Sequence, residues 1–294
     1  MSAPVPWRED VVARVASLHL RARQVVAGLG VGLRRSVRVG QAVEFADYKP
    51  YTPGDSLRDL DWRVLGRRDR LVVRRYRAET EMRATLVLDA SADLGSTPDK
   101  WESSVAIVAT IAYLLFLENE PIGLHVAAGS GGAVLRPRRG RAQLARIFAA
   151  LAALRPAGRA DLAATLAAVG TRAHDRSLLV LVGDFMEPTA HWVGALDALA
   201  RRRVDLRAIH LFDRREFELD FAQPLKLYSP EGGADETLDP AAMRESVREE
   251  AARFVAEVRD GVRARRGVHQ LVEARADLVP VIGEFLRGRE GRFG

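Results

Sequence analysis

The stretch Ala84–Asp93, ATLVLDASAD, decides the fold of this 294-residue chain. It opens with a continuous apolar run, which is typical of a strand buried on both faces of a parallel sheet. Asp89, Ser91 and Asp93 follow at alternate positions. They stand at the carboxyl end of the strand, where open α/β sheets place their ligands. Three oxygen-bearing side chains in one loop also suit a hard cation.

Strand and helix patterns alternate along the rest of the chain. Apolar strand-like runs cover residues 122–130, 133–140, 177–185, 205–213 and 268–274, and helical patterns cover 98–118, 142–154, 162–171, 190–203, 240–266 and 277–287. This alternation predicts an α/β fold with a doubly wound, mostly parallel sheet. The run 133–140 is expected to turn back beside 122–130 as an edge strand.

The region upstream of the first strand has a different pattern. Apolar positions between residues 8 and 28 are spaced for an amphipathic helix, and glycines follow it. Residues 33–82 mix short alternating segments with turn signals, which predicts a small β-rich element. We therefore expect an N-terminal helical segment at 1–32, the β-rich element at 33–82 and the α/β domain at 83–294.

Composition narrows the class of protein. The chain has no cysteine, which excludes disulfides, thiolate catalysis and cysteine-ligated metal sites. The net charge is +6, and only Lys49, Lys100 and Lys226 among the 45 basic residues are lysines. Aromatics make up 6% and are absent from the densest basic runs, so a solvated arginine surface is favoured over nucleic-acid binding. The apolar run 105–117 is too short to span a bilayer and the N-terminus lacks the apolar core of a signal peptide, so we expect a cytoplasmic protein.

A second aspartate, Asp184, ends the apolar run 177–185 just as Asp89 ends the first strand. If the two strands are neighbours, their ends lie roughly 5 Å apart. At that separation the two carboxylates and Ser91 could share one Mg²⁺ ion through waters. The alternative is that the aspartates cap the helices that follow, since Asp is a favoured N-cap residue.

The segment before the first strand, GQAVEFADYKPYTPGDSLRDLDW at 40–62, resembles the signature of the domain of unknown function 58 family. The matching positions are Glu44, Phe45, Lys49, Tyr51, Pro53, Gly54, Asp55, Arg58, Asp61 and Trp62. The resemblance continues through 178–185, 211–219 and 276–289, so it covers nearly the whole chain.

Within this signature we expect two kinds of role. Asp55, Arg58 and Asp61 lie in a predicted polar loop, and polar loop residues seldom serve packing, so they are the expected partner-binding surface. Trp62 is expected to be buried as a plug at the junction between the β-rich element and the sheet.

The resemblance implies a von Willebrand factor A-like domain with strand order 3-2-1-4-5-6 and a metal-ion-dependent adhesion site. In that site Asp89 and Ser91 match the family's first two positions, whereas Asp93 replaces a serine. A threonine is lost at Ala160-Asp161, and the last aspartate follows glycine rather than serine. The resemblance thus implies a partly degenerate site for Mg²⁺ or another divalent cation, with the ligands Asp89, Ser91, Asp93, Asp161 and Asp184.

Motifs for catalysis are lacking in the sequence. The six histidines are scattered without zincin spacing, and no phosphate-binding loop or nucleophile elbow occurs. The family resemblance implies a non-enzymatic protein-interaction module, an adaptor or chaperone-like partner of a MoxR-type AAA+ ATPase and its client. The alternatives are a metal-dependent hydrolase that uses the same carboxylates, and a nucleic-acid-binding protein.

Overall fold

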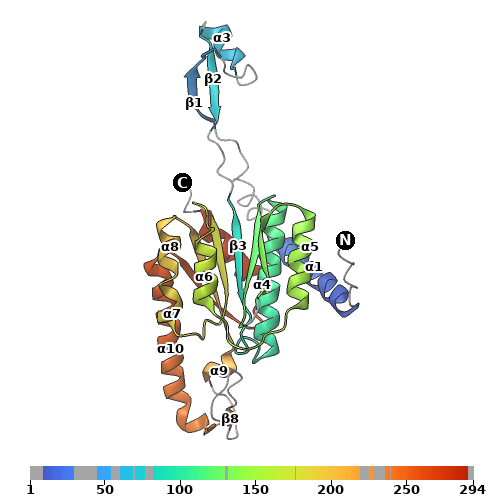
Figure 1. Cartoon of the computed structure of the whole chain (residues 1–294), viewed down its shortest axis with the longest axis vertical. Helices are drawn as coiled ribbons and strands as arrows, with labels where there is room; N and C mark the ends of the chain where they lie inside the picture. Colours follow the sequence, from blue (N-terminus) through green and yellow to red (C-terminus); the bar gives the residue numbers. More distant parts are fainter. Residues whose placement is uncertain are drawn as a thin grey trace.

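A six-stranded sheet forms the centre of the molecule (Figure 1). The computed structural model describes residues 9–29, 45–53, 60–68, 70–76, 82–129, 132–175, 177–218, 225–227, 236–238 and 240–290. The strands of the sheet are β3 (Ala84–Asp89), β4 (Ile122–Ala127), β5 (Val134–Arg138), β6 (Leu178–Gly183), β7 (Asp205–Phe212) and β10 (Val268–Glu273). Their order is β10-β7-β6-β3-β4-β5, and every pair is parallel except β4 with β5.

This order confirms the sequence-based prediction. Counted from β3, it is 3-2-1-4-5-6, with the antiparallel strand at the edge. The apolar runs explain the arrangement, because β4 and β6 are buried at every position and β3 at all but one. Strands of this kind need helices on both faces.

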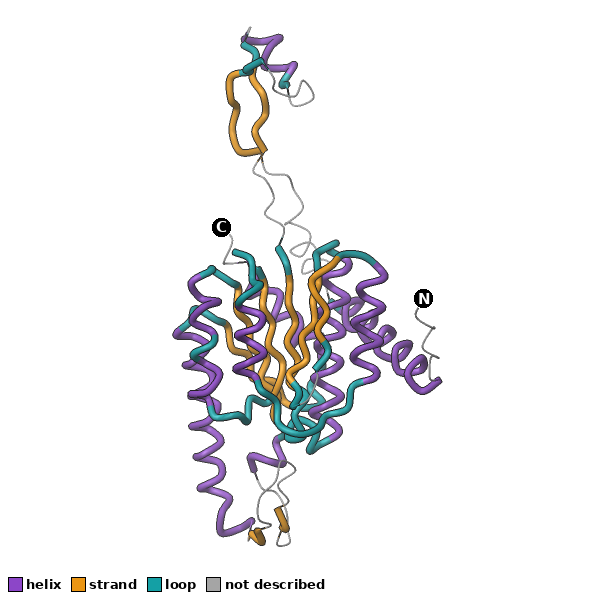
Figure 2. Tube along the Cα trace, viewed as in Figure 1, coloured by secondary structure: helices purple, strands orange, loops and turns teal. Residues whose placement is uncertain are grey.

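Two layers of helices cover the sheet (Figure 2). The helices of the body are α1 (Glu9–Gly28), α4 (Pro98–Leu117), α5 (Arg141–Ala153), α6 (Leu162–Gly170), α7 (Thr189–Val193), α8 (Leu196–Arg201), α9 (Arg214–Glu218), α10 (Pro240–Ala264) and α11 (Leu278–Glu290). One apolar core joins the sheet to α1, α4, α5 and α11. The other joins it to α6, α7, α8 and α10.

The first helix belongs to the body of the protein. Leu18, Ala22 and Val26 of α1 are buried in the same core as β3 and α4. The described helix of the segment expected at 1–32 is therefore packed on the α/β domain.

Helix α4 is the central helix of its layer. By length and composition it could cross a membrane, but 72% of its most apolar window is buried inside the molecule. Burial of this kind is what a core helix between a sheet and two further helices requires.

A small hairpin unit carries the described part of the family signature. Strands β1 (Phe45–Pro50) and β2 (Val72–Tyr76) pair antiparallel, and α3 (Trp62–Arg68) lies between them in sequence. Leu60 and Val73 are buried within the unit. Figure 1 shows the unit beyond the end of the sheet at which β3 begins, opposite the end where α9 lies.

Two local predictions need correction. Trp62 was expected to be a buried plug, but it is 64% exposed at the start of α3, so the indole does not join the hairpin unit to the sheet. The helix expected at 190–203 is two short helices, α7 and α8, with Gly194 between them. Helix α9 and the two-stranded sheet of β8 (Leu225–Leu227) and β9 (Glu236–Leu238) were not predicted.

Candidate functional site at the carboxyl end of the sheet

The candidate site lies where the direction of strand winding reverses. β3 has β4 on one side and β6 on the other, so the carboxyl ends of β3 and β6 flank the topological switch point. Asp89 is the last residue of β3 and Asp184 directly follows β6. Both are buried, with 5% and 3% of their surface exposed. A Cβ atom on Gly183 would lie 2.5 Å from the Asp89 Cβ atom, so the close approach of the two strand ends requires glycine there.

Asp89 organises the loop that follows it. Its Oδ1 atom accepts a hydrogen bond of 2.9 Å from the Ser91 backbone N–H, and Ser91 Oγ accepts one of 3.3 Å from the Leu94 N–H. Burial, together with the negative charge of the neighbouring Asp184, raises the pKa of Asp89 to about 7, although the bonds from Ser91 oppose the rise. Asp93, half-buried in the same loop, adds to the negative potential.

Lys100 provides the positive charge at the centre of the site. It lies in the first turn of α4, with its side chain 3% exposed. Its Nζ atom is 3.0 Å from Asp184 Oδ2 and 2.9 Å from Glu216 Oε1 of α9. Burial lowers the pKa of Lys100, but the carboxylates of Asp184 and Glu216 raise it more, so the ammonium stays charged. Burial also raises the pKa of Asp184, and the contact with Lys100 opposes that rise.

An outer set of ion pairs holds α9 against this site. Arg215 Nη2 is 2.6 Å from Asp213 Oδ2 and 3.1 Å from Asp99 Oδ2, and Arg275 Nη2 is 2.7 Å from the same Asp99 oxygen. Ser96 Oγ donates a hydrogen bond of 3.0 Å to Glu216 Oε1. The arginines are more than half exposed, so each pair alone contributes little, but together they fix where α9 lies.

Phe185, the residue after Asp184, is held by aromatic packing. Phe185 has a φ of 55°, a left-handed conformation that is costly for a phenylalanine. Its ring stacks on Trp192 at 5.4 Å and meets His210 edge to face at 5.3 Å. His210 Nδ1 in turn lies 3.1 Å from His269 Nε2. Burial, together with the neighbouring His269, lowers the pKa of His210 to about 3.

The structure brings together some of the predicted metal ligands and not others. Asp89, Ser91 and Asp184 converge, with Asp93 in the adjoining loop. Asp161 instead serves as the N-cap of α6, where its Oδ1 atom accepts a hydrogen bond of 2.7 Å from the Ala164 N–H. Within the described ranges, no three Asp, Glu or His side chains are grouped so that they could hold a metal ion.

The divalent cation implied by the family resemblance does not fit these residues. Lys100 engages Asp184 Oδ2, which would be a principal ligand. Lys100 and Glu216 were not among the site residues predicted from the sequence. One signal was available for Lys100, because a lysine is rare in a chain whose basic residues are nearly all arginine.

Of the predicted partner-binding residues, Asp61 is described and lies in the hairpin unit. Asp55 and Arg58 are outside the described residues, so their role stays a prediction. Asp61 is 4% exposed and caps α3, because its Oδ1 atom accepts hydrogen bonds from the Arg63 and Val64 N–H groups at 2.9 and 3.2 Å. Tyr48 donates a further bond of 2.9 Å to Asp61 Oδ2. The prediction that Asp61 contacts a partner is therefore corrected, because its carboxylate is a structural cap.

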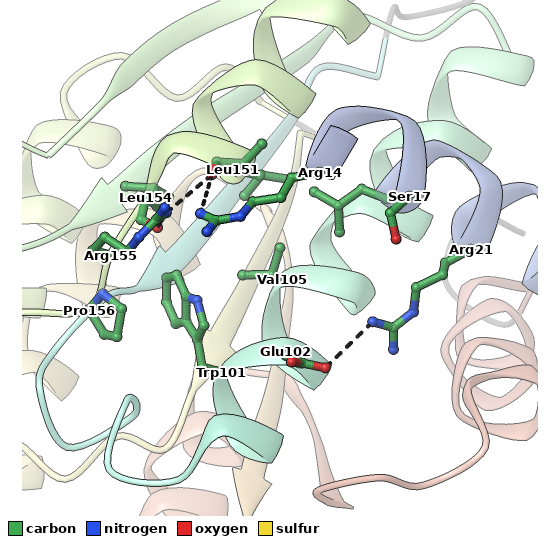
Figure 3. A pocket seen from close by; sticks show the side chains of 12 residues that line it. Arg14, Ser17, Arg21, Trp101, Glu102, Val105, Leu151, Leu154, Arg155 and Pro156 are labelled. Carbon is green, nitrogen blue, oxygen red and sulfur yellow. Dashed lines mark hydrogen bonds and ion pairs between the residues drawn. The ribbon is translucent and has the colours of Figure 1, made fainter. Parts of the chain in front are cut away.

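A separate pocket of about 410 Å³ lies between α1, α4 and α5 (Figure 3). Arg14 and Arg155 both donate to the Ala152 carbonyl at the end of α5, at 3.3 and 3.2 Å. Such bonds satisfy the carbonyls that a helix leaves open at its C-terminus. Trp101, next to Lys100 in the sequence, lines this pocket. The first turn of α4 therefore contributes one side chain to the pocket and another, that of Lys100, to the strand-end site.

The strand order defines a doubly wound α/β fold with two carboxylates at its switch point, which is the arrangement that the von Willebrand factor A-like resemblance implies. The chain belongs to the family described as "Protein of unknown function DUF58", whose profile matches residues 47–261. It is 29% identical over 250 residues to "Uncharacterized protein Rv1480" of Mycobacterium tuberculosis (strain ATCC 25618 / H37Rv), covering 82% of this chain and 78% of the relative. "Uncharacterized protein Mb1516" of Mycobacterium bovis has the same identity and coverage.

Similar solved structures include the conserved hypothetical protein BatB from Bacteroides thetaiotaomicron. It shares 12% identity and a TM-score of 0.47, with 71% of this chain and 98% of that chain covered. An aerotolerance-related membrane protein from Bacteroides fragilis shares 13% identity and a TM-score of 0.44, covering 72% and 100%. The SpRpn10 VWA domain shares 13% identity and a TM-score of 0.41, covering 71% and 95%. At these identities and TM-scores, the three similarities say nothing about the function of this chain.

Proposed function

We propose that this chain is a non-enzymatic protein-interaction module that acts in the cytoplasm as an adaptor or chaperone-like partner of a MoxR-type AAA+ ATPase. The observation that carries the proposal is a set of exposed apolar side chains on the hairpin unit. Tyr48 is 46% exposed, Trp62 64% and Leu71 49%. The unit itself lies apart from the body (Figure 1).

These side chains have the character of binding residues. Tryptophan and tyrosine are enriched among the interface residues that contribute most binding energy, because each buries a large area at little conformational cost. Exposure of several such residues on one small unit, whose own interior is filled by Leu60 and Val73, supports docking to another protein. Asp55 and Arg58, in the same segment of the sequence, are proposed as polar contacts around them.

The strand-end site supports contact rather than chemistry. The carboxylates of Asp89 and Asp184 are engaged by the Ser91 backbone and by Lys100, and Lys100 is shared with Glu216. This ion-pair network leaves Glu216 as the partly exposed charged group of the site, with 38% of its side chain accessible. The ATPase is proposed as the partner because of the family resemblance, and the hairpin unit is proposed as its docking point.

The test is binding between the purified chain and the MoxR-type ATPase of the same host, measured by biolayer interferometry. Trp62→Ala is expected to weaken binding at least tenfold while the melting temperature changes by no more than a few degrees. Leu117→Ala is the matched control, because Leu117 is an apolar side chain of the body that is 53% exposed. Equal affinities for the wild type and Trp62→Ala, or no binding by the wild type, would refute the proposal.

A further inference from the structure

The strand-end site contains a cation that belongs to the chain itself. The Lys100 ammonium lies between Asp184 Oδ2 at 3.0 Å and Glu216 Oε1 at 2.9 Å. Its side chain is 3% exposed, and that of Asp184 is 4% exposed. A buried lysine requires carboxylate partners of this kind, since an isolated buried charge is costly. The Lys100 ammonium is therefore the positive charge that the carboxylates of Asp184 and Glu216 bind.

Part of a divalent-ion ligand set is nevertheless present. Asp89, Ser91 and Asp184 converge at the switch point, with Asp93 in the adjoining loop, and oxygen donors are the ligands that magnesium and manganese prefer. A divalent ion beside Lys100 would meet its charge at short range and would compete with it for Asp184. Because the ammonium is tethered to α4, it cannot diffuse away, so it is present at every concentration of free metal.

Glu216 completes the arrangement from the opposite side. Its Oε1 atom accepts from both Lys100 Nζ and Ser96 Oγ, at 2.9 and 3.0 Å. In an adhesion site of the usual form, a carboxylate from another protein binds the cation. Here a carboxylate of the same chain, on α9, binds the cation in its place.

We propose that Lys100 is the built-in cation of this site, that the site is consequently independent of metal, and that Glu216 acts as an internal acidic ligand on Lys100. An acidic side chain of a partner would replace Glu216 rather than bind a metal ion. Only this last step rests on the proposed function; the replacement of metal by Lys100 is a property of the isolated chain.

The first test measures Mn²⁺ binding to the purified full-length chain by titration calorimetry. The wild type is expected to give no heat of binding at millimolar Mn²⁺. Lys100→Ala removes the ammonium and leaves room beside Asp184, so it is expected to bind Mn²⁺ at least tenfold more tightly than the wild type. Lys100→Ala with Asp184→Asn is the control and should lose that binding. Mn²⁺ binding by the wild type that Asp89→Ala abolishes would overturn the proposal, as would a folded Lys100→Ala that gains none.

A second measurement needs no Lys100 variant and so holds even if Lys100→Ala fails to fold. Lysines of the native wild type are acylated with a succinimidyl ester, and each of the three lysines is quantified by peptide mass spectrometry. Lys100 is expected to react at least tenfold more slowly than in the urea-unfolded chain, and Mn²⁺ should not change its rate. Fast labelling of Lys100, or labelling that rises with Mn²⁺, would overturn the proposal.

The contact with Glu216 has its own control. Glu216→Gln is expected to increase the labelling of Lys100 several-fold, because a neutral amide holds the ammonium less tightly. Glu218→Gln alters the same short helix but pairs with Arg214 at 3.8 Å, so it should leave Lys100 protected. Equal protection in the two variants would refute the role given to Glu216. None of these assays involves the ATPase, so a failure here is distinct from a failure of the proposed function.

Discussion

Replacing Lys100 by methionine isolates the energetic role of its charge. Methionine keeps most of the aliphatic length of lysine, so the change removes the ammonium with little loss of packing. Asp184 then remains buried, with its side chain 4% exposed, and loses its ion pair with the Lys100 ammonium at 3.0 Å. Its Oδ1 atom is buried and makes no hydrogen bond within the described residues, so that oxygen cannot compensate.

The expected cost follows from this burial. Removing one partner of a buried ion pair typically costs about 3–5 kcal/mol. We expect the lower end, about 3 kcal/mol at pH 8, because Glu216 is 38% exposed and can be rehydrated. The cost should shrink as the pH falls, because Asp184 can take up a proton once Lys100 is gone. For a body of this size, about 3 kcal/mol corresponds to a fall of roughly 6–12 °C in melting temperature.

The assay is urea unfolding of a double-mutant cycle with Lys100→Met, Asp184→Asn and the double variant. A coupling energy of about 2 kcal/mol or more between the two positions is expected, because the double variant leaves neither buried charge of the Lys100–Asp184 pair without its partner. A single-variant cost below about 1 kcal/mol, or a coupling energy below about 0.5 kcal/mol, would mean that the ion pair does not form as described.

Three further outcomes are expected. The pKa of His210 is about 3 in the folded chain against 6.5 for an unperturbed histidine, so below pH 6.5 the unfolded state binds a proton that the folded state does not. His210 should therefore cost about 2 kcal/mol of stability at pH 5 relative to pH 8. Urea unfolding of His210→Gln should show a flatter pH profile than the wild type. Gly183→Ala should destabilise by about 1–3 kcal/mol because its Cβ would meet Asp89, whereas Gly194→Ala, with nothing within 4 Å, should not; equal effects would refute the close approach. Trp62→Ala should change the free energy of unfolding by less than about 1 kcal/mol, because the indole is mostly exposed.

The strands of the sheet were predictable from local pattern, whereas their order was implied by the family resemblance. Apolar runs such as ATLVLD and LLVLVG are typical of central strands, and their alternation with helices leaves few topologies. The pairing of Asp89 with Asp184 followed from that order, since both stand at the ends of adjacent strands.

The contacts that define the site were not predictable in the same way. Lys100 and Asp184 are 84 residues apart, and only the packed position of α4 brings them together. Glu216 lies on a five-residue helix that is too short to show periodicity. Asp61 was placed on a contact surface because its segment is polar, yet an aspartate just before a helix is also a favoured cap, and the structure shows that role. For Trp62, hydrophobicity alone predicted burial, but exposure depends on what the unit packs against.

A crystal structure of the wild type grown with millimolar manganese chloride would decide whether this site holds its own cation. Anomalous scattering at the manganese edge locates any bound ion directly. We expect no anomalous peak beside Asp89 and Asp184, and clear density for the Lys100 ammonium between Asp184 and Glu216. A manganese peak about 2.2 Å from the oxygens of Asp89, Ser91 or Asp184, with Lys100 turned away, would contradict the assignment.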